Sequence, residues 1–185
     1  MAGGRTAATT PPPRNVGSTR SCPAEPRISR APGFARRGLC HHQGMRAVLQ
    51  RVDGAQVEAE GEVVGTVDGE VLLALVGVTH DDGPEQVATI ARKICELRIL
   101  EGERSVLDIG AQVLVVSQFT LYADVRRGRR PSWSAAAPAE VAEPLLEQLV
   151  DAIRERGVQV ATGRFGAHMR IGLVGDGPIT ILVEA

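Results

Sequence analysis

The chain has 185 residues, 43% of them hydrophobic, a formal net charge of −1, and only one Trp, one Tyr and three Phe. This length suits one domain of ordinary size with a core built mainly from Val, Leu, Ile and Ala. The balanced charge excludes a broad basic surface for nucleic acid, so any RNA contact must be local. No apolar run approaches the roughly 18 residues of a membrane span, and no membrane contact is expected.

Residues 1–44 lack the pattern of a folded domain. They hold seven Arg, no Lys, one acidic residue and six Pro, with no apolar period. This composition predicts disorder, and an Arg-rich, acid-poor leader is also typical of a transit peptide. Alternatively, translation starts at Met45, where the apolar pattern begins. We interpret residues 1–44 as a disordered or misassigned leader and residues 45–185 as the domain, whose 14 basic and 21 acidic residues give about −7.

The cysteines show no paired spacing. They are Cys22, Cys40 and Cys95, and Cys95 falls in a helical pattern where a small core residue is expected. An odd number of cysteines without a signal peptide predicts a reducing compartment, and we expect a cytoplasmic protein. No Cys/His spacing points to zinc, and neither a metal nor another cofactor is expected.

The first half of the domain predicts short strands and one helix. Strands are expected at residues 45–52, 55–59, 63–67 and 71–78, with turns at the Gly-containing pairs 53–54, 60–61 and 68–69. Apolar residues then recur with the helical period from about Glu85 to Leu97, and Pro84 suits the first turn. Another short strand is expected at residues 98–100.

The stretch from residue 113 to residue 124 organises the second half. It opens with Val-Leu-Val-Val, which predicts a buried strand, and breaks into the polar residues of a strand-end motif: Ser117, Gln118, Phe119 and Thr120. Mixed α/β folds often present a ligand at such a strand end. On residue types alone, a strand capped by ordinary turn residues stays an open alternative.

A cluster of arginines follows the strand-end motif. Arg126, Arg127, Arg129 and Arg130 surround Gly128 in an otherwise acidic domain. The planar guanidinium matches phosphate oxygens, so this basic cluster predicts tRNA phosphate contact, although charge runs are usually solvated loops. Trp133, the only Trp in the chain, is either a packing anchor or a subunit contact.

The C-terminal part predicts a second helix and three strands. The helix is expected at residues 139–156 and the strands at residues 158–161, 169–174 and 179–183. Gly177 and Pro178 lie between the last two strands, where a turn is the plain interpretation. The elements together predict a mixed α/β fold in which a curved, largely antiparallel, barrel-like β-sheet packs against two long helices.

Five short motifs resemble those of the D-aminoacyl-tRNA deacylases, also called D-tyrosyl-tRNA deacylases. They are MRAVLQRV (45–52), SQFTLYAD (117–124), GRRPS (128–132), TGRFGA (162–167) and DGPIT (176–180). Each is weak alone, but the set in this order covers the whole domain. The resemblance implies a homodimer that hydrolyses the ester between a D-amino acid and the 3′ end of tRNA. Glycyl-tRNA, which lacks a side chain, is also expected as a substrate.

The resemblance also implies how chirality is read. In that family a cis Gly-Pro dipeptide of one subunit reaches into the pocket of the other and rejects an L side chain by sterics. This role carries over to Gly177 and Pro178. Arg51 matches an arginine that supports the Gly-Pro loop in the family.

The resemblance places the strand-end motif around the terminal adenosine and the scissile ester. An aromatic ring such as Phe119 can stack on an unpaired adenine, and backbone N–H groups near Thr120 can hold an oxyanion. Thr120 is either a nucleophile that forms an acyl-enzyme, which needs a nearby base, or a hydrogen-bonding group beside a ribose 2′-hydroxyl that assists the reaction. We favour the second role, because none of the four His residues lies in a family motif. A non-catalytic RNA-binding module is a further alternative.

Three features depart from the family pattern. The loop at residues 101–104 is shorter than usual, Gly175 stands where an Asn usually precedes the Gly-Pro, and His168 replaces a common acidic residue. His168 is expected to be a surface or half-buried residue rather than a base.

Overall fold

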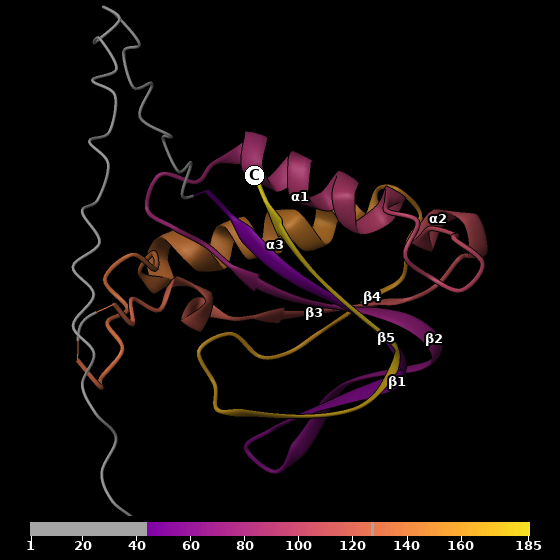
Figure 1. Cartoon of the computed structure of the whole chain (residues 1–185), viewed down its shortest axis with the longest axis horizontal. Helices are drawn as coiled ribbons and strands as arrows, with labels where there is room; N and C mark the ends of the chain where they lie inside the picture. The colour runs from indigo at the N-terminus through magenta and orange to yellow at the C-terminus, as the bar shows by residue number, and fades with distance from the viewer. Residues whose placement is uncertain (1–43, 127) are drawn as a thin grey trace, which may run out of the picture. The chain divides into compact units, whose positions relative to one another are not determined.

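Residues 44–126 and 128–185 are described by the computed structural model (Figure 1). In chain order the elements are β1 (Arg46–Ala59), β2 (Glu62–Gly77), α1 (Pro84–Glu96), α2 (Val106–Ile109), β3 (Val113–Ser117), the 3-10 turn η1 (Phe119–Tyr122), α3 (Ala139–Arg154), β4 (Val160–Thr162) and β5 (Met169–Glu184). The expectations for the leader, Cys22, Cys40 and Arg127 lie outside the described residues.

A single sheet with the strand order β4-β3-β2-β1-β5 carries the domain. The two long pairings, β1 with β2 and β1 with β5, are antiparallel, whereas the short pairings of β3 with β2 and β4 are parallel. Helices α1 and α3 pack together over one face (Figure 1). These features confirm the mixed α/β fold with a largely antiparallel sheet. Within residues 44–126 and 128–185, no backbone pairing joins the edge strands β4 and β5 into a closed barrel.

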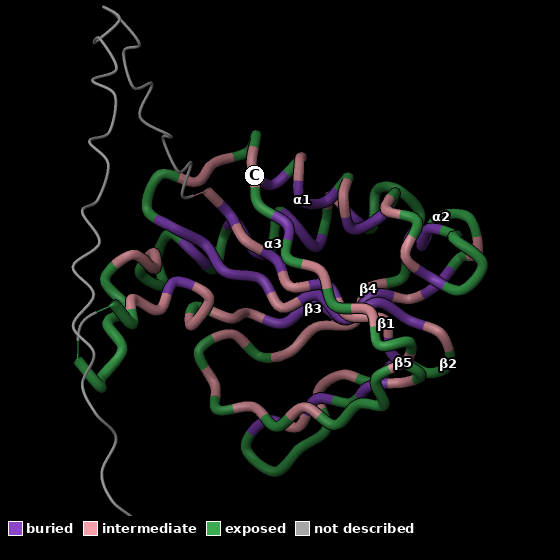
Figure 2. Tube along the Cα trace, viewed as in Figure 1, coloured by how far each residue is buried: buried purple, intermediate pink, exposed green. Residues whose placement is uncertain are grey.

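The far halves of β1 and β2 curl back toward the sheet, and this curvature produces two cores. Gly65 of β2 lies so close to β4 that a Cβ there would be 2.7 Å from the Thr162 carbonyl oxygen. Alternate side chains of one strand enter different cores: Val113 and Val115 face the helices, whereas Leu114 and Val116 face the curled hairpin. In Figure 2 the buried segments run through the strands beneath the helices.

Two of the three expected turns in the first half lie inside long strands. β1 and β2 each continue through the Gly-containing pair that suggested a turn, and the register shifts between Asp53 and Ala55. Gly54 and Gly69 have φ values of 78° and 73°, which bend a strand at a bulge as readily as they reverse it. Only the pair at residues 60–61 reverses the chain. In the same way, Gly177 and Pro178 lie within β5 rather than between two strands.

Some element boundaries also differ from expectation. Residues 98–100 form no strand, since the only pairing there is an isolated bridge between Leu100 and Arg104. α1 and α3 confirm the two long helices, although α3 ends at Arg154. α2 was not predicted, but Ser105 and Asp108 cap its start by exchanging hydrogen bonds.

Cys95 is fully buried on α1, as expected for a core residue. Burial raises the pKa of its thiol, which keeps the sulfur protonated and unreactive.

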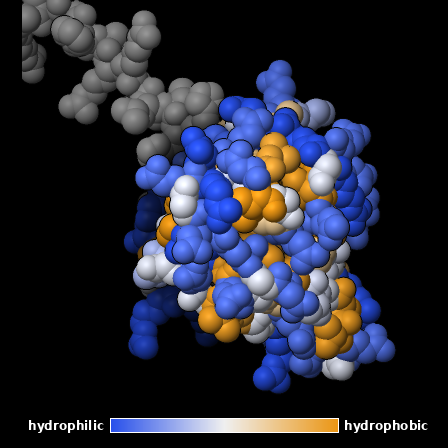
Figure 3. Space-filling model, turned by 90° about the vertical axis from the view of Figure 1, so that its right-hand side faces the viewer, coloured by the Kyte–Doolittle hydropathy of each residue, from blue (hydrophilic) through white to orange (hydrophobic). Residues whose placement is uncertain are grey.

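Among the described residues, no helix is both long and apolar enough to cross a membrane. Figure 3 shows one face of the molecule, on which hydrophilic residues surround several separate hydrophobic patches.

Candidate functional site

The strand-end motif lies where β3 ends and η1 begins. β3 ends at Ser117, and the Gln118 N–H donates to the Val76 carbonyl of the neighbouring strand at 2.6 Å. The chain then tightens into η1, with Leu121 N–H bonded to the Gln118 carbonyl at 3.2 Å and Ala123 N–H to the Thr120 carbonyl at 3.1 Å. The four motif residues are therefore presented together at the carboxyl end of a buried parallel strand, as the sequence predicted.

Gly77 allows η1 to lie directly against β2. A Cβ at this position would be 2.9 Å from the Tyr122 ring and 3.0 Å from the Gln118 carbonyl oxygen. Contacts this short do not occur with a side chain present, so a residue larger than Gly would push the turn away from the sheet. The position of the motif thus depends on a close backbone approach that was not among the expected site features.

Thr120 is hydrogen bonded by its own motif. The Gln118 side-chain amide donates to the Thr120 hydroxyl, which orients that oxygen. Neither described His is a partner of Thr120: the His80 ring is bonded to the Ser134 carbonyl at 3.1 Å, and His168 is exposed. Within the parts of the chain that the structure describes, Thr120 therefore has no imidazole partner that could act as its base.

Phe119 and Trp133 form an aromatic pair at the surface. Their ring centroids are 5.5 Å apart with an interplanar angle of 78°, an edge-to-face arrangement. Phe119 is 56% exposed, so one side of its ring is open to a ligand. The Trp133 contact also ties the loop after the basic cluster to the strand-end motif.

The basic cluster is divided by a local ion pair. Arg126 donates from Nε and Nη2 to the Asp124 carboxylate at 2.9 and 2.7 Å. These hydrogen bonds hold the pKa of Asp124 well below its usual range and tie Arg126 to a carboxylate within the same loop. Arg129 and Arg130 are exposed, and no ion pair among the described residues involves them. Of the expected phosphate contacts, these two are the available cations, and Arg127 lies outside the described residues.

The Gly-Pro dipeptide projects from the edge strand β5. Gln50 pairs with Thr180 and Val52 with Gly175, so residues 176–179 bulge out opposite Arg51. The Gly177–Pro178 bond is cis, and both residues are exposed.

Arg51 and Asp176 secure the base of this bulge. The buried Nε of Arg51 lies 2.8 Å from Asp176 Oδ2, in an ion-pair rather than a linear hydrogen-bond geometry. Gly177 has a φ of 114°, and a Cβ there would be 2.9 Å from Arg51 Nη2. Arg51 therefore contacts the base of the Gly-Pro bulge, and its supporting role stays a prediction.

A groove of about 530 Å³ opens beside Ser117, between α3 and the loop after β4. Its apolar lining includes Val115, Leu146, Val150 and Phe165. The rest of the lining comes from α3 and from the first half of the TGRFGA motif: Glu143, Glu147, Asp151, Arg154, Thr162, Gly163 and Arg164. An apolar floor with polar groups around it suits a small ligand that has a flat ring and hydroxyl groups.

The α3 side of this groove was missed by sequence reasoning. Glu143, Glu147 and Asp151 recur every four residues, a spacing that places them on one helix face. This spacing was the available signal for an acidic wall of a site, but an acidic helix face is ordinarily exposed to solvent. Only the packing of α3 beside β3 turns it into the wall of a groove.

Two of the features that depart from the family pattern are the loop at residues 101–104 and Gly175. The loop at residues 101–104 is held by hydrogen bonds of Arg104 to the Glu101 carbonyl at 2.7 Å and of Glu101 N–H to the Glu70 carboxylate. No atom would meet a Cβ on Gly175 within 4 Å. Over residues 44–126 and 128–185, no group of three or more His, Cys, Asp or Glu could hold a metal ion.

These features define a mixed α/β protein with a polar strand-end motif and an exposed aromatic ring beside a groove. A family model described as D-Tyr-tRNA(Tyr) deacylase matches residues 48–184, and the chain belongs to this family. The match confirms the resemblance carried by the five motifs.

Curated relatives agree with this assignment, and solved structures share the fold. The D-aminoacyl-tRNA deacylases of Kineococcus radiotolerans and Beutenbergia cavernae are 64% and 67% identical over 141 residues, which are 76% of this chain and 100% of each relative. A solved structure titled c-Myc DNA Unwinding Element Binding Protein has a TM-score of 0.70 and 34% identity, over 76% of this chain and 98% of that one. A probable eukaryotic D-amino acid tRNA deacylase, at 16% identity and a TM-score of 0.66 over 76% of this chain and 99% of that one, shares the fold.

Proposed function

We propose that this chain hydrolyses the ester between a D-amino acid and the 3′ end of tRNA and releases the free D-amino acid and tRNA. The observation that carries the proposal is the strand-end motif, which stands beside a groove of nucleoside size in a chain of the deacylase family. The substrate is made where tRNA is aminoacylated, so we place the enzyme in the cytoplasm.

The groove beside Ser117 is the proposed binding site of the terminal adenosine. Its apolar floor suits the base, and the α3 carboxylates can accept hydrogen bonds from ribose hydroxyls or an exocyclic amine. The same carboxylates repel phosphate, so the inner nucleotides are expected to leave the groove. Arg129 and Arg130 are the cations available to meet their phosphates.

In the proposed reaction the strand-end motif positions the ester rather than attacking it. Gln118 orients the Thr120 hydroxyl, which then donates a hydrogen bond to the substrate. The first N–H groups of a 3-10 turn have no partner within that turn, so the amides at Phe119 and Thr120 are suited to a developing oxyanion. The ribose 2′-hydroxyl beside the ester assists water, because the motif supplies no base.

Chiral selection is proposed to come from the Gly-Pro dipeptide of a partner subunit. The dipeptide projects from the edge of β5 instead of folding onto its own chain's interior, and both residues are exposed. Leu173 and Val174 of the same strand are 40% and 63% exposed, which is unusual for large apolar residues and favours a homodimer. A fixed backbone wall would exclude an L side chain and admit D side chains and glycine.

Hydrolysis of D-tyrosyl-tRNA, L-tyrosyl-tRNA and glycyl-tRNA tests the proposal directly. We expect rapid release of D-tyrosine and glycine and no release of L-tyrosine above the spontaneous rate. Binding of tRNA without hydrolysis of any ester would instead support a non-catalytic RNA-binding module. Equal hydrolysis of both tyrosyl esters would contradict the proposed chiral selection.

A chain that starts at Met45 is expected to keep full activity. Such a chain lacks Gly44, whose carbonyl accepts a hydrogen bond from the Tyr122 hydroxyl at 2.5 Å. Removing that bond should reduce the free energy of unfolding by about 0.5–1.5 kcal/mol. Denaturant unfolding and initial rates of both chains provide the measurement. A larger decrease in the free energy of unfolding, or a clear decrease in the initial rate, would contradict our proposal that residues 45–185 form the functional domain.

Replacing both Arg129 and Arg130 by Ala is expected to weaken tRNA binding equally for all acylating residues. The salt dependence of binding should also flatten by up to about one counterion for each phosphate that is no longer bound. Arg92→Ala with Arg98→Ala is the matched control, because it removes the same charge from exposed positions outside the site. A changed D/L preference with an unchanged salt slope would argue against phosphate contact.

A further inference from the structure

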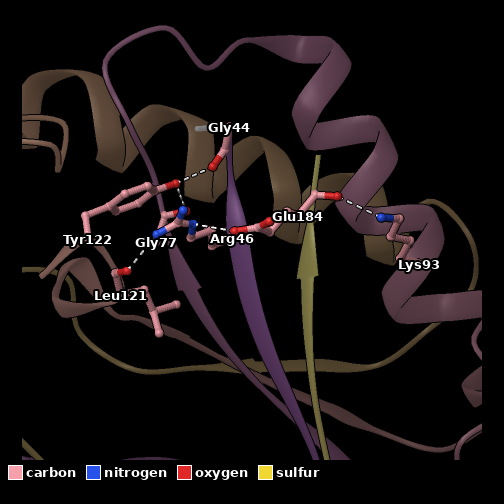
Figure 4. A network of polar contacts seen from close by, with 7 residues as sticks. All are labelled: Gly44, Arg46, Gly77, Lys93, Leu121, Tyr122 and Glu184. Carbon is pink, nitrogen blue, oxygen red and sulfur yellow. Dashed lines mark hydrogen bonds and ion pairs between the residues drawn. The ribbon is translucent and has the colours of Figure 1, made fainter. Parts of the chain in front are cut away.

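The turn that carries the strand-end motif is held from outside by Arg46 of β1. Arg46 Nη1 donates to the Leu121 carbonyl at 3.1 Å, although 75 positions separate the two residues. The same guanidinium lies over the Tyr122 ring, 5.0 Å from its centroid. Its buried Nε faces Glu184 Oε1 of β5 at 2.7 Å (Figure 4).

Tyr122 makes further contacts that hold the end of η1 in place. Its side chain is 3% exposed and lies between the Arg46 guanidinium and Gly77, which has no Cβ to displace the ring. The Tyr122 hydroxyl contacts the Gly44 carbonyl at 2.5 Å and the Gly77 carbonyl at 3.4 Å. Burial raises the pKa of Tyr122, so the phenol stays neutral and remains a donor.

The end of the turn depends on contacts from outside it. A 3-10 turn of four residues has few internal hydrogen bonds, and η1 ends at Tyr122, so no N–H of a following turn donates to the Leu121 carbonyl. Leu121 and Tyr122 directly follow Phe119 and Thr120, so a shift at the end of η1 moves both site residues. The contacts of Arg46 therefore help to fix where the site residues stand, together with the close approach of η1 to Gly77.

We propose that Arg46 is a positioning residue, which holds Phe119 and Thr120 in place by binding the Leu121 carbonyl and covering Tyr122. Glu184 fixes the guanidinium, and the Lys93 side chain of α1 donates to the Glu184 carbonyl at 2.7 Å, away from η1 (Figure 4). An exposed ion pair alone contributes little to stability, and the Glu184 side chain is 46% exposed. The effect of Arg46 is thus expected on site geometry rather than mainly on folding. The rate part of the test rests on the proposed deacylase function.

The chain offers a local probe that does not depend on activity. Trp133 is the only Trp, and its edge-to-face contact with Phe119 reports on the position of η1. Arg46→Met, Arg46→Lys and the control Lys93→Met are compared by acrylamide quenching of Trp133, thermal unfolding, tRNA affinity and single-turnover hydrolysis of D-tyrosyl-tRNA. Lys93→Met removes a neighbouring cation from the same polar network but leaves the contacts of η1 intact.

For Arg46→Met we expect a rate about tenfold or more below wild type, a tRNA dissociation constant within twofold, and altered Trp133 quenching. Arg46→Lys should recover part of the rate, since it keeps the charge but not the planar fork. Lys93→Met should stay within twofold of wild type in rate and quenching. If Arg46→Met does not fold, Arg46→Lys and Glu184→Gln are compared with wild type by the hydrolysis rate and by Trp133 quenching.

Unchanged Trp133 quenching in a folded Arg46 variant would overturn the proposal, whatever the rate. A decrease in tRNA affinity as large as the decrease in rate would also overturn it, because it would indicate a binding role. A wild-type chain without deacylase activity would instead refute the proposed function, and the quenching comparison would still decide whether Arg46 holds η1.

Discussion

Removing the 2′-hydroxyl of the terminal ribose is expected to slow hydrolysis by about 10²–10⁴-fold, the usual range for a general acid–base contribution. Thr120→Ala is expected to cost far less, up to roughly tenfold, since a single hydrogen bond is worth about 0.5–1.5 kcal/mol. The structural reason is the environment of Thr120. Its hydroxyl is bonded by the Gln118 amide, which cannot accept a proton as a base.

Single-turnover rates for both changes on one D-aminoacyl-tRNA provide the measurement. Thr89→Ala, at a half-buried position of α1 away from the site, controls for the general effect of removing a threonine. An inactive Thr120→Ala that still folds and binds tRNA would refute the substrate-assisted mechanism. A burst of product from the wild type before steady state would then support an acyl-enzyme on Thr120.

Gly177→Ala is expected to reduce the D/L preference and the rate on D-tyrosyl-tRNA by about 5- to 150-fold. The backbone here has a φ of 114°, where a side chain costs about 1–3 kcal/mol. A Cβ would also lie 3.0 Å from the backbone nitrogen of Ile179, which cannot give way as a flexible side chain can. The dipeptide must therefore move, and the proposed wall against L side chains moves with it.

Gly175→Ala is the matched control two residues away in the same strand. No atom lies within 4 Å of a Cβ built on Gly175, and its φ is not in the region that favours glycine. This variant should therefore keep the rate and the D/L preference within twofold. Competition between D- and L-tyrosyl-tRNA measures both variants, and an unchanged preference in Gly177→Ala would contradict chiral selection by the dipeptide.

Mixing two defective variants tests whether the site is shared between subunits. Gly177→Ala retains an intact strand-end motif, and Phe119→Ala retains an intact dipeptide. In a mixed dimer, a shared site would combine the intact halves, so refolding the two variants together should recover about a quarter of wild-type activity if subunits pair at random. No recovery from a mixture shown to contain mixed dimers would place the whole site within one chain.

Periodic segments were predictable because burial of one face requires the period. Val87, Ile90 and Ile94 are buried on α1 as their spacing indicated, and the apolar run of β3 is buried on both faces of the sheet. The strand-end motif was equally predictable, since β3 must end where its polar residues begin. Its four residues are consecutive, so chain connectivity alone brings them together.

Glycine pairs were harder to interpret because one backbone conformation serves two purposes. Gly54 and Gly69 adopt positive φ inside long strands, whereas Gly61 adopts it at a true reversal. The difference lies in the partner strand: β5 pairs with β1 on both sides of Asp53 and keeps the strand extended. That partner is more than a hundred residues away and leaves no local signal.

The sequence by itself determined the mixed α/β class, the two long helices, the family and the strand-end motif, because these depend on period, order and adjacent residues. Only the tertiary structure brought α3 beside Ser117 to make a groove, paired Arg126 with Asp124, and set Arg46 against Leu121 and Glu184. Apart from the Arg126–Asp124 pair, each of these joins residues far apart in the chain. Their association is decided by which surfaces the fold buries together, and a single sequence does not encode that choice in any local pattern.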